Sequence, residues 1–316
     1  MHLKNSKTVV IKIGSSLLVD DKNKIRKKWL ESFAKDLKKL KSKNKEIIIV
    51  SSGAIALGCK KMNLKNINLK LDKSQAIASV GQIELMNLFS QTFSKFRLNI
   101  SQILLTLDDT EERRRSINAK RTFENLFKLG YIPIVNENDT IATSEIKYGD
   151  NDRLAARVAQ IIGADTLIIL SDVNGLYDKS KNIVKTVNKL DENIYSLVDN
   201  SKNSYGSGGI LTKLDAAKIC MNSGCHMFLA NGSKEYPLKR MVIEKTFTHF
   251  TPKISSLDAR KKWIISSLSS SAVISVDAGA AKALLNGKSL LAAGIIKVKG
   301  SFDKGENVLI VDQNEK

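Results

Sequence analysis

Residues 9–16 read VVIKIGSS, an apolar run that is broken only by Lys12 and ends in glycine and serine. Similar apolar runs follow at residues 47–50, 100–106, 132–135, 166–170 and 226–230. Runs without polar alternation are typical of strands that are buried on both faces of a parallel sheet. We therefore expect these segments to be the strands of one mostly parallel sheet.

Helical patterns lie between these runs. Trp29, Phe33 and Leu37 recur every four residues, and Leu154 and Val158 repeat this spacing in a later stretch. Strands that alternate with helices predict an α/β fold, here a three-layer αβα sandwich around the sheet. Ligands of such sheets bind beyond the carboxyl ends of the strands, so polar residues directly after the strands are the candidates for chemistry.

The composition is that of a soluble globular protein. The chain has 316 residues, of which 42% are hydrophobic and 26% charged, enough for two domains or for one large domain with an appendage. Its three cysteines form no CxxC pair, which favours a reducing compartment and argues against a zinc site. No apolar run reaches the roughly 18 residues of a membrane span. We expect a cytoplasmic protein without a signal peptide or membrane segment.

The net charge of +19 is typical of nucleic-acid-binding proteins. The basic residues are mostly lysines scattered along the chain, whereas arginine is the better residue for bidentate phosphate contacts. No basic stripe interleaved with aromatic residues occurs. A solvated lysine-rich surface is therefore favoured over a specific RNA site, although weak, salt-sensitive adhesion to polyanions is expected.

The composition and pattern of the sequence change after residue 235. Residues 236–271 contain two prolines and a serine cluster, which indicate a helix followed by a linker. Short apolar pieces separated by glycines follow at 273–276, 294–300 and 307–312, and they indicate a small β-rich appendage. The predicted domains are 1–250 and 272–316, with a linker over 251–271.

Two of the polar clusters that follow predicted strands lie early in the chain. Lys12 inside a buried strand is costly unless its ammonium reaches an anion, and the glycine at position 14 lets backbone amides approach one. Ser51, Ser52 and Gly53 open a helix, where they form either an anion pocket or a plain helix cap.

Two further clusters lie later in the chain. Residues 136–139 and 149–152 carry more acids and amides than capping requires. Ser171-Asp172 is joined by the loop 206–213, GSGGILTK, which lacks the Gly-Lys-Ser/Thr ending of a Walker A motif. Two lysines, several glycine loops and a carboxylate cluster at one sheet edge favour phosphoryl transfer from ATP. No histidine has the context of a general base, which favours a carboxylate acceptor, because a carboxylate of pKa about 4 is already ionised.

At these residues the sequence closely resembles the amino-acid kinase family. The most specific segments are VSSGAIALG (50–58), IPIVNENDTIATSEIKYGDNDRLAA (132–156) and GSGGILTKLDAA (206–217). The resemblance implies phosphorylation of the L-glutamate side-chain carboxylate by ATP with Mg²⁺, giving γ-glutamyl phosphate in the first step of proline synthesis. It also implies a homo-oligomer, with glutamate-5-semialdehyde dehydrogenase as functional partner. A sibling kinase with another carboxylate or phosphate acceptor stays open, as does, more weakly, an RNA-binding accessory protein.

The resemblance also implies roles for residues at matching positions. Lys12 and Lys213 would stabilise the transferring phosphoryl group, and Asp152 would orient both lysines. The residues implied to bind glutamate are Ser52, Gly53, Asp139 and Asn151. Those implied to bind ATP are Lys12, Gly14, Ser171, Asp172, Ser207, Gly208, Gly209, Ile210, Leu211, Thr212 and Lys213. The sequence names no protein ligand for Mg²⁺.

The C-terminal stretches VDAGAAKALLNGKSLLAAGI (276–295) and KGSFDKGENVLIV (299–311) resemble a PUA module. The sequence ends at Lys316, earlier than such a module does, so we expect an incomplete PUA-like segment. An open set of short strands buries little apolar surface. We therefore expect this segment to form no specific RNA site.

Overall fold

The computed structural model describes residues 5–20, 24–64, 70–142, 150–199, 209–252, 273–302 and 308–312. The chain forms two compact units, Met1–Leu257 and Asp258–Lys316. The predicted linker over 251–271 falls almost wholly outside the described residues, so the predicted domain boundaries stay a prediction.

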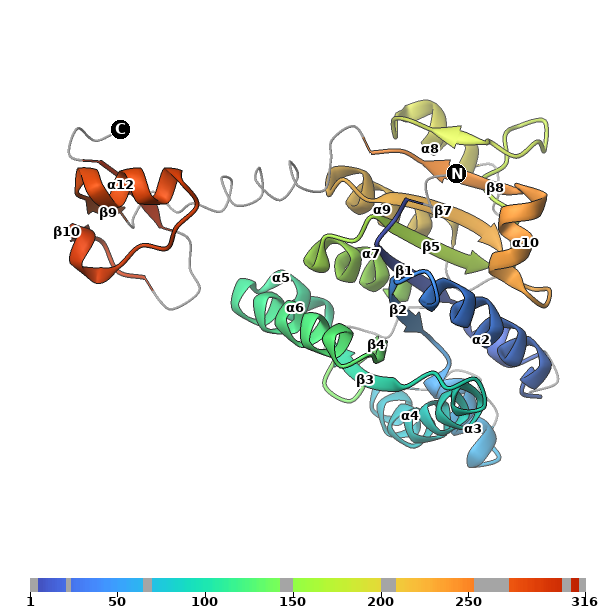
Figure 1. The fold of residues 1–316 in the computed structure, drawn as a ribbon. Coiled ribbons are helices and arrows are strands. Elements are labelled where there is room, and N and C mark those ends of the chain that lie inside the picture. Colours follow the sequence, from blue (N-terminus) through green and yellow to red (C-terminus); the bar gives the residue numbers. More distant parts are fainter. Residues whose placement is uncertain are drawn as a thin grey trace. The chain divides into compact units, whose positions relative to one another are not determined.

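The first unit is built on one sheet, whose strand order is β3-β4-β2-β1-β5-β7-β8-β6 (Figure 1). The strands are β1 (Thr8–Ile13), β2 (Glu46–Ser51), β3 (Ile100–Leu105), β4 (Ile132–Glu137), β5 (Thr166–Ser171), β6 (Thr186–Val187), β7 (His226–Asn231) and β8 (Phe247–Phe250). Every pair from β3 through to β7 is parallel, and β8 runs antiparallel to β7. The expected strands and the mostly parallel sheet are confirmed.

Two strands at one edge of the sheet were not expected from the sequence. β8 lies where a helix and linker were predicted, and its residues alternate between partly and fully buried. Such alternation is typical of an antiparallel strand with one covered face, but four residues are too few to reveal it. β6 has two residues and shows no period at all.

Helices cover both faces of the sheet, which confirms the three-layer sandwich (Figure 1). One apolar core joins β1 to α1 (Ser15–Leu18), α2 (Lys27–Lys41), α3 (Ala54–Lys61), α4 (Leu71–Ser94) and α10 (Pro237–Glu244). The other joins β1 to the helices α6 (Arg113–Lys128), α7 (Asp150–Ile162) and α9 (Ile210–Asn222). The shorter helices α5 (Leu107–Glu111) and α8 (Glu192–Asp199) complete the unit.

The packing of α3 on α4 depends on a glycine. A Cβ atom on Gly81 of α4 would lie 1.7 Å from the carbonyl oxygen of Ala54, the first residue of α3. Only a residue without a side chain allows this backbone approach. The contact fixes the start of α3 directly after the Ser51-Ser52-Gly53 cluster.

The second unit contains a three-stranded sheet of order β10-β9-β11. Its elements are β9 (Val273–Val276), α12 (Ala278–Leu285), a 3₁₀ turn η2 (Ala292–Gly294), β10 (Ile295–Lys299) and β11 (Leu309–Val311). The predicted strands are confirmed, whereas α12, capped by the Asp277 carboxylate at 2.7 Å from the amide of Ala280, was not predicted. Among the described residues of this unit, only Ile274 and Val276 are buried hydrophobic side chains.

Candidate active site

The carboxyl ends of β1, β2, β4 and β5 bring the predicted clusters together at one edge of the sheet. Lys12 of β1 lies in register with Val50 of β2 and Ile169 of β5. Because the strands are parallel, Gly14 and the ends of β2 and β5 follow at the same level.

Lys12 reaches this edge from the covered side of its strand. Val9, Ile11 and Ile13 of β1 belong to the core formed with α2 and α4, and Val10 belongs to the opposite core under α7 and α9. Successive side chains of a strand point to opposite faces. Lys12 therefore shares the face of Val10 and points toward the helices that carry Asp152 and Lys213.

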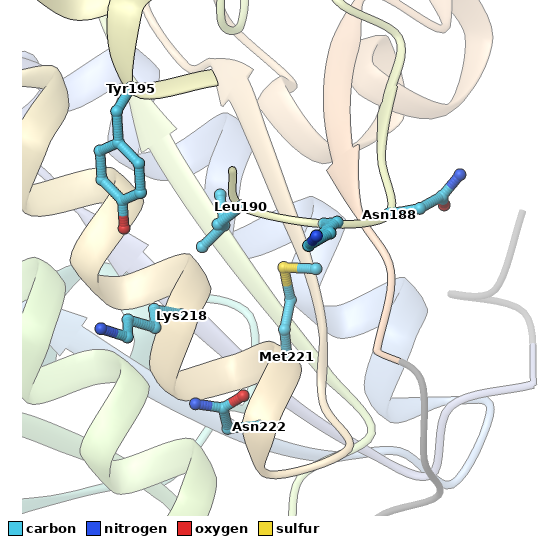
Figure 2. Close-up of a pocket in the computed structure, with 7 residues that line it drawn as sticks. Asn188, Leu190, Tyr195, Lys218, Met221 and Asn222 are labelled. Atoms are coloured by element: carbon cyan, nitrogen blue, oxygen red, sulfur yellow. The ribbon is translucent and has the colours of Figure 1, made fainter. Parts of the chain in front are cut away.

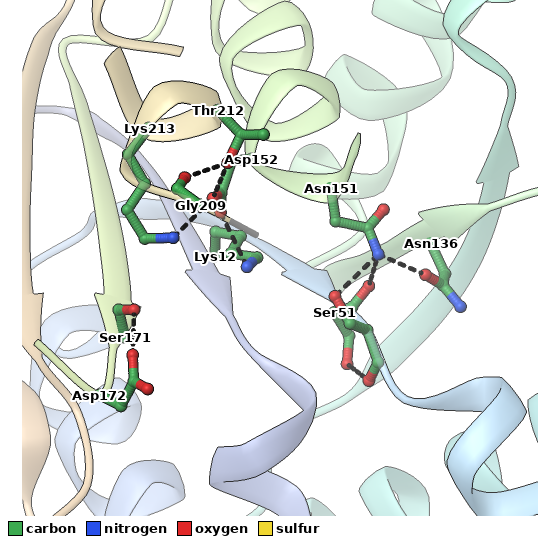
Figure 3. A network of polar contacts seen from close by, with 11 residues as sticks. Lys12, Ser51, Asn136, Asn151, Asp152, Ser171, Asp172, Gly209, Thr212 and Lys213 are labelled. Atoms are coloured by element: carbon green, nitrogen blue, oxygen red, sulfur yellow. Dashed lines mark hydrogen bonds and ion pairs between the residues drawn. The ribbon is translucent and has the colours of Figure 1, made fainter. Parts of the chain in front are cut away.

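Asp152, in the first turn of α7, is the centre of an ion cluster (Figure 3). Its Oδ1 lies 2.7 Å from the Lys12 ammonium and its Oδ2 lies 3.2 Å from that of Lys213. The side chain of Asp152 is completely buried, and the two lysine side chains are 11% and 8% exposed. Two cations share one anion, so the cluster keeps one net positive charge.

The lysines determine the ionisation of Asp152. Burial by itself favours the protonated acid, but the charges and hydrogen bonds of Lys12 and Lys213 outweigh it, so the pKa of Asp152 lies below its ordinary value. The carboxylate is therefore ionised at neutral pH. Thr212, beside Lys213 in the first turn of α9, donates a further hydrogen bond of 3.2 Å to Oδ2.

A second polar network begins at Asn151, the neighbour of Asp152 (Figure 3). Its Nδ2 donates to Ser52 Oγ at 2.8 Å, to the carbonyl oxygen of Ser51 at 3.2 Å and to Asn136 Oδ1 at 3.3 Å. Asn136 in turn donates to Gln82 Oε1 on α4 at 2.8 Å. The predicted pair Ser52 and Asn151 is thus in direct contact.

Two buried polar atoms of this network have no hydrogen-bond partner within the described part of the chain. They are Oδ1 of Asn151 and Nε2 of Gln82. A buried polar atom without a partner costs about 1–3 kcal/mol, which a ligand offering a donor or an acceptor would recover. The network therefore has binding capacity left for a polar ligand.

Asp139 is connected to the same network through a shared pocket. Together with Gln82, Glu137 and Thr140 it lines a pocket of about 200 Å³, so Gln82 belongs to both the pocket and the network. Burial raises the pKa of Asp139 to about 6, and no cationic side chain of the described residues pairs with it. Gly53, at φ +108°, precedes α3 and lies close to Ser15.

The remaining predicted residues that the structure describes lie near the ion cluster (Figure 3). Ser171 Oγ donates to Asp172 Oδ1 at 2.9 Å, and a Cβ atom on Gly14 would lie 4.0 Å from the Lys12 ammonium. The residues Gly209, Ile210, Leu211 and Thr212 form the start of α9. Ser207 and Gly208 lie outside the described residues.

Sequence reasoning assigned no role to Asn136, Gln82 or Asn231. Asn231 at the end of β7 donates to the carbonyl oxygen of Asp172 at 2.9 Å. Asn136 stood in a cluster that was singled out, and its richness in amides was the signal. Gln82 lies on a helix distant in sequence, and only the folded topology brings it to the site.

A separate pocket of about 390 Å³ lies between the segment after β6, helix α8 and helix α9 (Figure 2). Its lining residues are Asn188, Lys189, Leu190, Tyr195, Lys218, Met221 and Asn222. None of the predicted site residues lines it. Within the described ranges, no three His, Cys, Asp or Glu side chains gather as a metal site, and no helix is long and apolar enough to cross a membrane.

Comparison with known proteins gives two family matches and close relatives. The model of the amino acid kinase family matches residues 7–231, and that of the PUA domain matches residues 272–316. Glutamate 5-kinase from Pelagibacter ubique (strain HTCC1062) is 62% identical over 320 residues, covering 99% of this chain and 87% of the relative. Glutamate 5-kinase from Paramagnetospirillum magneticum (strain ATCC 700264 / AMB-1) is 45% identical, covering 98% and 86%.

Solved structures share the fold of the first unit. Carbamate kinase from Giardia lamblia bound to AMP-PNP superposes with a TM-score of 0.56 at 16% identity, covering 78% of this chain and 99% of the other. UMP kinase from Ureaplasma parvum has a TM-score of 0.51 at 15% identity, covering 78% and 98%. At such identities the likeness concerns the fold alone.

Proposed function

Because the chain belongs to the amino acid kinase family, we propose that it transfers the γ-phosphoryl group of ATP to the side-chain carboxylate of L-glutamate. The product is γ-glutamyl phosphate. The observation that carries the proposal is the Lys12–Asp152–Lys213 cluster, which stands beside the Asn151–Ser52 contact. A centre for phosphoryl charge thus adjoins a polar pocket for an acceptor.

Lys12 and Lys213 stabilise the phosphoryl group during transfer. Phosphoryl transfer depends on positioning and on positive charge around the equatorial oxygens more than on covalent catalysis. One net positive charge in a nearly water-free cluster suits that task. Asp152 keeps the two ammonium groups apart and oriented, because each of its oxygens is committed to one lysine.

The nucleotide lies along the end of β1, the end of β5 and the start of α9. In this proposal, backbone amides near Gly14 and in the segment 207–213 bind the phosphates. Ser171 and Asp172 bind the rest of the nucleotide. Free amides at a helix start attract phosphate oxygens. The local hydrogen bonds of Asp172 with Ser171 and Asn231 support a preformed segment at this place.

L-glutamate lies against Ser52, Gly53, Asn151 and Asp139 in this proposal. Asp139 accepts the substrate ammonium, since a partly buried carboxyl that pairs with no cation of the described residues gains most from a charged partner. Oδ1 of Asn151, which has no hydrogen-bond partner among the residues that the structure describes, accepts a hydrogen bond from the substrate. The acceptor carboxylate is ionised at neutral pH, so the reaction needs no general base.

Mg²⁺ belongs to the substrate in this proposal and enters bound to the ATP phosphates. Each oxygen of Asp152 faces a lysine ammonium, and these two positive charges disfavour a metal cation at the same carboxylate. Mg²⁺ is commonly held by substrate phosphates with few protein ligands. When bound, it neutralises phosphate charge.

The finer partners are also proposals. An acyl phosphate hydrolyses readily, so an enzyme that reduces it, glutamate-5-semialdehyde dehydrogenase, acts close by in the cytoplasm and continues proline synthesis. We further propose a homo-oligomer. The predicted lack of specific RNA binding by the PUA-like segment stays a prediction.

A coupled assay of ADP release tests the function. Mg-ATP is offered with L-glutamate, L-aspartate, N-acetylglutamate or UMP, and hydroxylamine traps any acyl phosphate as a hydroxamate. We expect ADP and hydroxamate with glutamate. Turnover with aspartate, N-acetylglutamate or UMP but none with glutamate would instead establish the sibling-kinase alternative.

A further inference from the structure

One face of α2 holds the turn between β7 and α10. We define the β7–α10 turn as residues 231–236. Arg26, Trp29, Ser32 and Asp36 all make hydrogen bonds to this turn or to the start of α10. Residues three to four apart lie on one helix face, so these side chains form a single row.

Trp29 makes the most buried contact of the row. Its indole Nε1 donates to the carbonyl oxygen of Gly232 at 2.6 Å, and its side chain is 2% exposed. The ring stacks on Phe33 at a centroid distance of 5.4 Å. The stacking on Phe33 is an apolar contact. The side chain of Trp29 therefore makes its polar contact with the turn through the indole N–H.

Arg26 connects the turn to a second segment. Its guanidinium donates to the carbonyl oxygen of Ser233 and, at 3.4 Å, to that of Ser16 in α1. Ser16 lies two residues after Gly14. Arg26 therefore bridges the segment beside the ion cluster and the β7–α10 turn.

The other side of the turn contacts the end of β5. The amide of Gly232 donates to the carbonyl oxygen of Ser171 at 2.8 Å, and Asn231 donates to that of Asp172 at 2.9 Å. Gly232 also packs tightly, because a Cβ atom there would lie 2.8 Å from Leu17 Cδ1 and from Leu170 Cβ. The turn therefore packs against α1, α2 and the end of β5.

We propose that Arg26 and Trp29 are positioning residues for ATP, an inference that rests on the nucleotide placement proposed above. They touch no substrate. They hold the β7–α10 turn, which in turn sets the places of Ser171, Asp172 and α1. A preformed nucleotide site avoids the cost of ordering these segments on binding.

Asp36 provides the matched control. It belongs to the same row, is buried, and its Oδ2 accepts the amides of Leu238 and Lys239 at 2.9 and 3.1 Å. These amides lie in the first turn of α10, beyond the β7–α10 turn. Loss of Asp36 therefore removes a helix cap and leaves the contacts to Ser171 and Asp172 in place.

The test compares the dissociation constant of ATP, measured by calorimetry without acceptor, with the melting temperature. Trp29→Phe keeps the stacked ring and removes the N–H donor, and Arg26→Ala removes the bridge. We expect each to weaken ATP binding about five- to tenfold, the equivalent of about one hydrogen bond. The KM for glutamate should stay within about twofold, since the acceptor site lies on other strands.

Asp36→Ala should lower the melting temperature and leave the ATP dissociation constant unchanged. If Trp29→Phe and Arg26→Ala also lower the melting temperature and leave the ATP dissociation constant unchanged, both residues support only the fold and the proposal is wrong. Should Trp29→Phe fail to fold, the partly exposed Arg26 carries the test. Arg26→Lys should recover only part of the affinity, because one ammonium cannot match the fork that reaches two carbonyls, and full recovery would contradict the bridge.

The outcomes separate this inference from the proposed function. A chain that binds ATP but phosphorylates another acceptor overturns the glutamate assignment. The roles of Arg26 and Trp29 are then still decided by the ATP dissociation constants of the same variants. A chain without affinity for ATP overturns both.

Discussion

The ammonium of Lys12 lies 2.7 Å from Oδ1 of Asp152, a carboxylate with no solvent exposure. With Lys213 at 3.2 Å from the second oxygen, each oxygen of this buried carboxylate faces one ammonium group. The role proposed for Asp152 is therefore electrostatic, and it can be separated from substrate binding by experiment.

Asp152→Asn should abolish most of the activity. The amide keeps the shape of the side chain but leaves two ammonium groups without a counter-charge, so they repel each other and lose their orientation. We expect kcat to fall about a hundredfold or more, and the free energy of unfolding to fall by about 3 kcal/mol. Steady-state kinetics and chemical denaturation measure both. Asp108→Asn, at an exposed acid, is the control, and near-native kcat in Asp152→Asn would contradict the role.

Lys213→Ala and Asp139→Ala should affect different kinetic constants. In the proposed mechanism Lys213 acts most strongly on the charge of the transition state, so kcat should fall on the order of a hundredfold. Asp139 is proposed to bind the ground-state ammonium, so its loss should mainly raise the KM for glutamate. Steady-state kinetics with both substrates varied distinguish the two. Changes confined to the KM for ATP in both variants would show that the roles are wrongly assigned.

The KM for glutamate should rise as the pH falls through about 6, the raised pKa of Asp139. Below that pH the carboxyl is protonated and cannot pair with the substrate ammonium. Lowering the pH has the opposite effect on the stability of the free protein, which should increase. Because the folded pKa exceeds the unfolded one, ionised Asp139 destabilises the free protein above pH 6, and this cost disappears as the pH falls.

The profile of KM against pH from 5 to 8 measures the effect, and Asp139→Asn should flatten it. In that variant the melting temperature of the free protein should also rise less than in the unchanged protein when the pH is lowered. A step near pH 6 that persists in Asp139→Asn would assign the titration to another group.

Gly81→Ala should destabilise the fold through the contact between α3 and α4. The added methyl group would lie 1.7 Å from the carbonyl oxygen of Ala54, so the helices must separate, at a cost of about 1–3 kcal/mol or more. Thermal unfolding measures it. Ser79→Ala, exposed on the same helix, should change stability little, and equal melting temperatures for the two variants would rule out the close approach.

The sequence predicted the centre of the sheet and the cluster at its edge for physical reasons that can be named. Apolar runs without alternation identify central strands, and a lysine within such a run, as at Lys12, requires a nearby anion. The anion turned out to be the protein's own Asp152. The short edge strands β6 and β8 carry too few residues to show a period.

The polar network of the acceptor side was only partly predictable. Ser52 and Asn151 were implied by the family resemblance of their segments, and the structure places their side chains in contact at 2.8 Å. Gln82 sits on α4, where local sequence gives no reason to choose it over other polar residues of that helix. Arg26 and Trp29 read as ordinary residues of an amphipathic helix, because their partners are backbone carbonyls, which leave no trace in a sequence.

The central place of β1 has a consequence for how the chain is made. β1 precedes its sheet neighbours β2 and β5 in the chain, and Lys12 acquires its counter-ion only when Asp152 has been synthesised. Until then the nascent strand carries an unpaired ammonium that opposes early burial and premature pairing with other chains. Lys12 can therefore be buried together with its counter-charge only after the chain has been synthesised as far as Asp152.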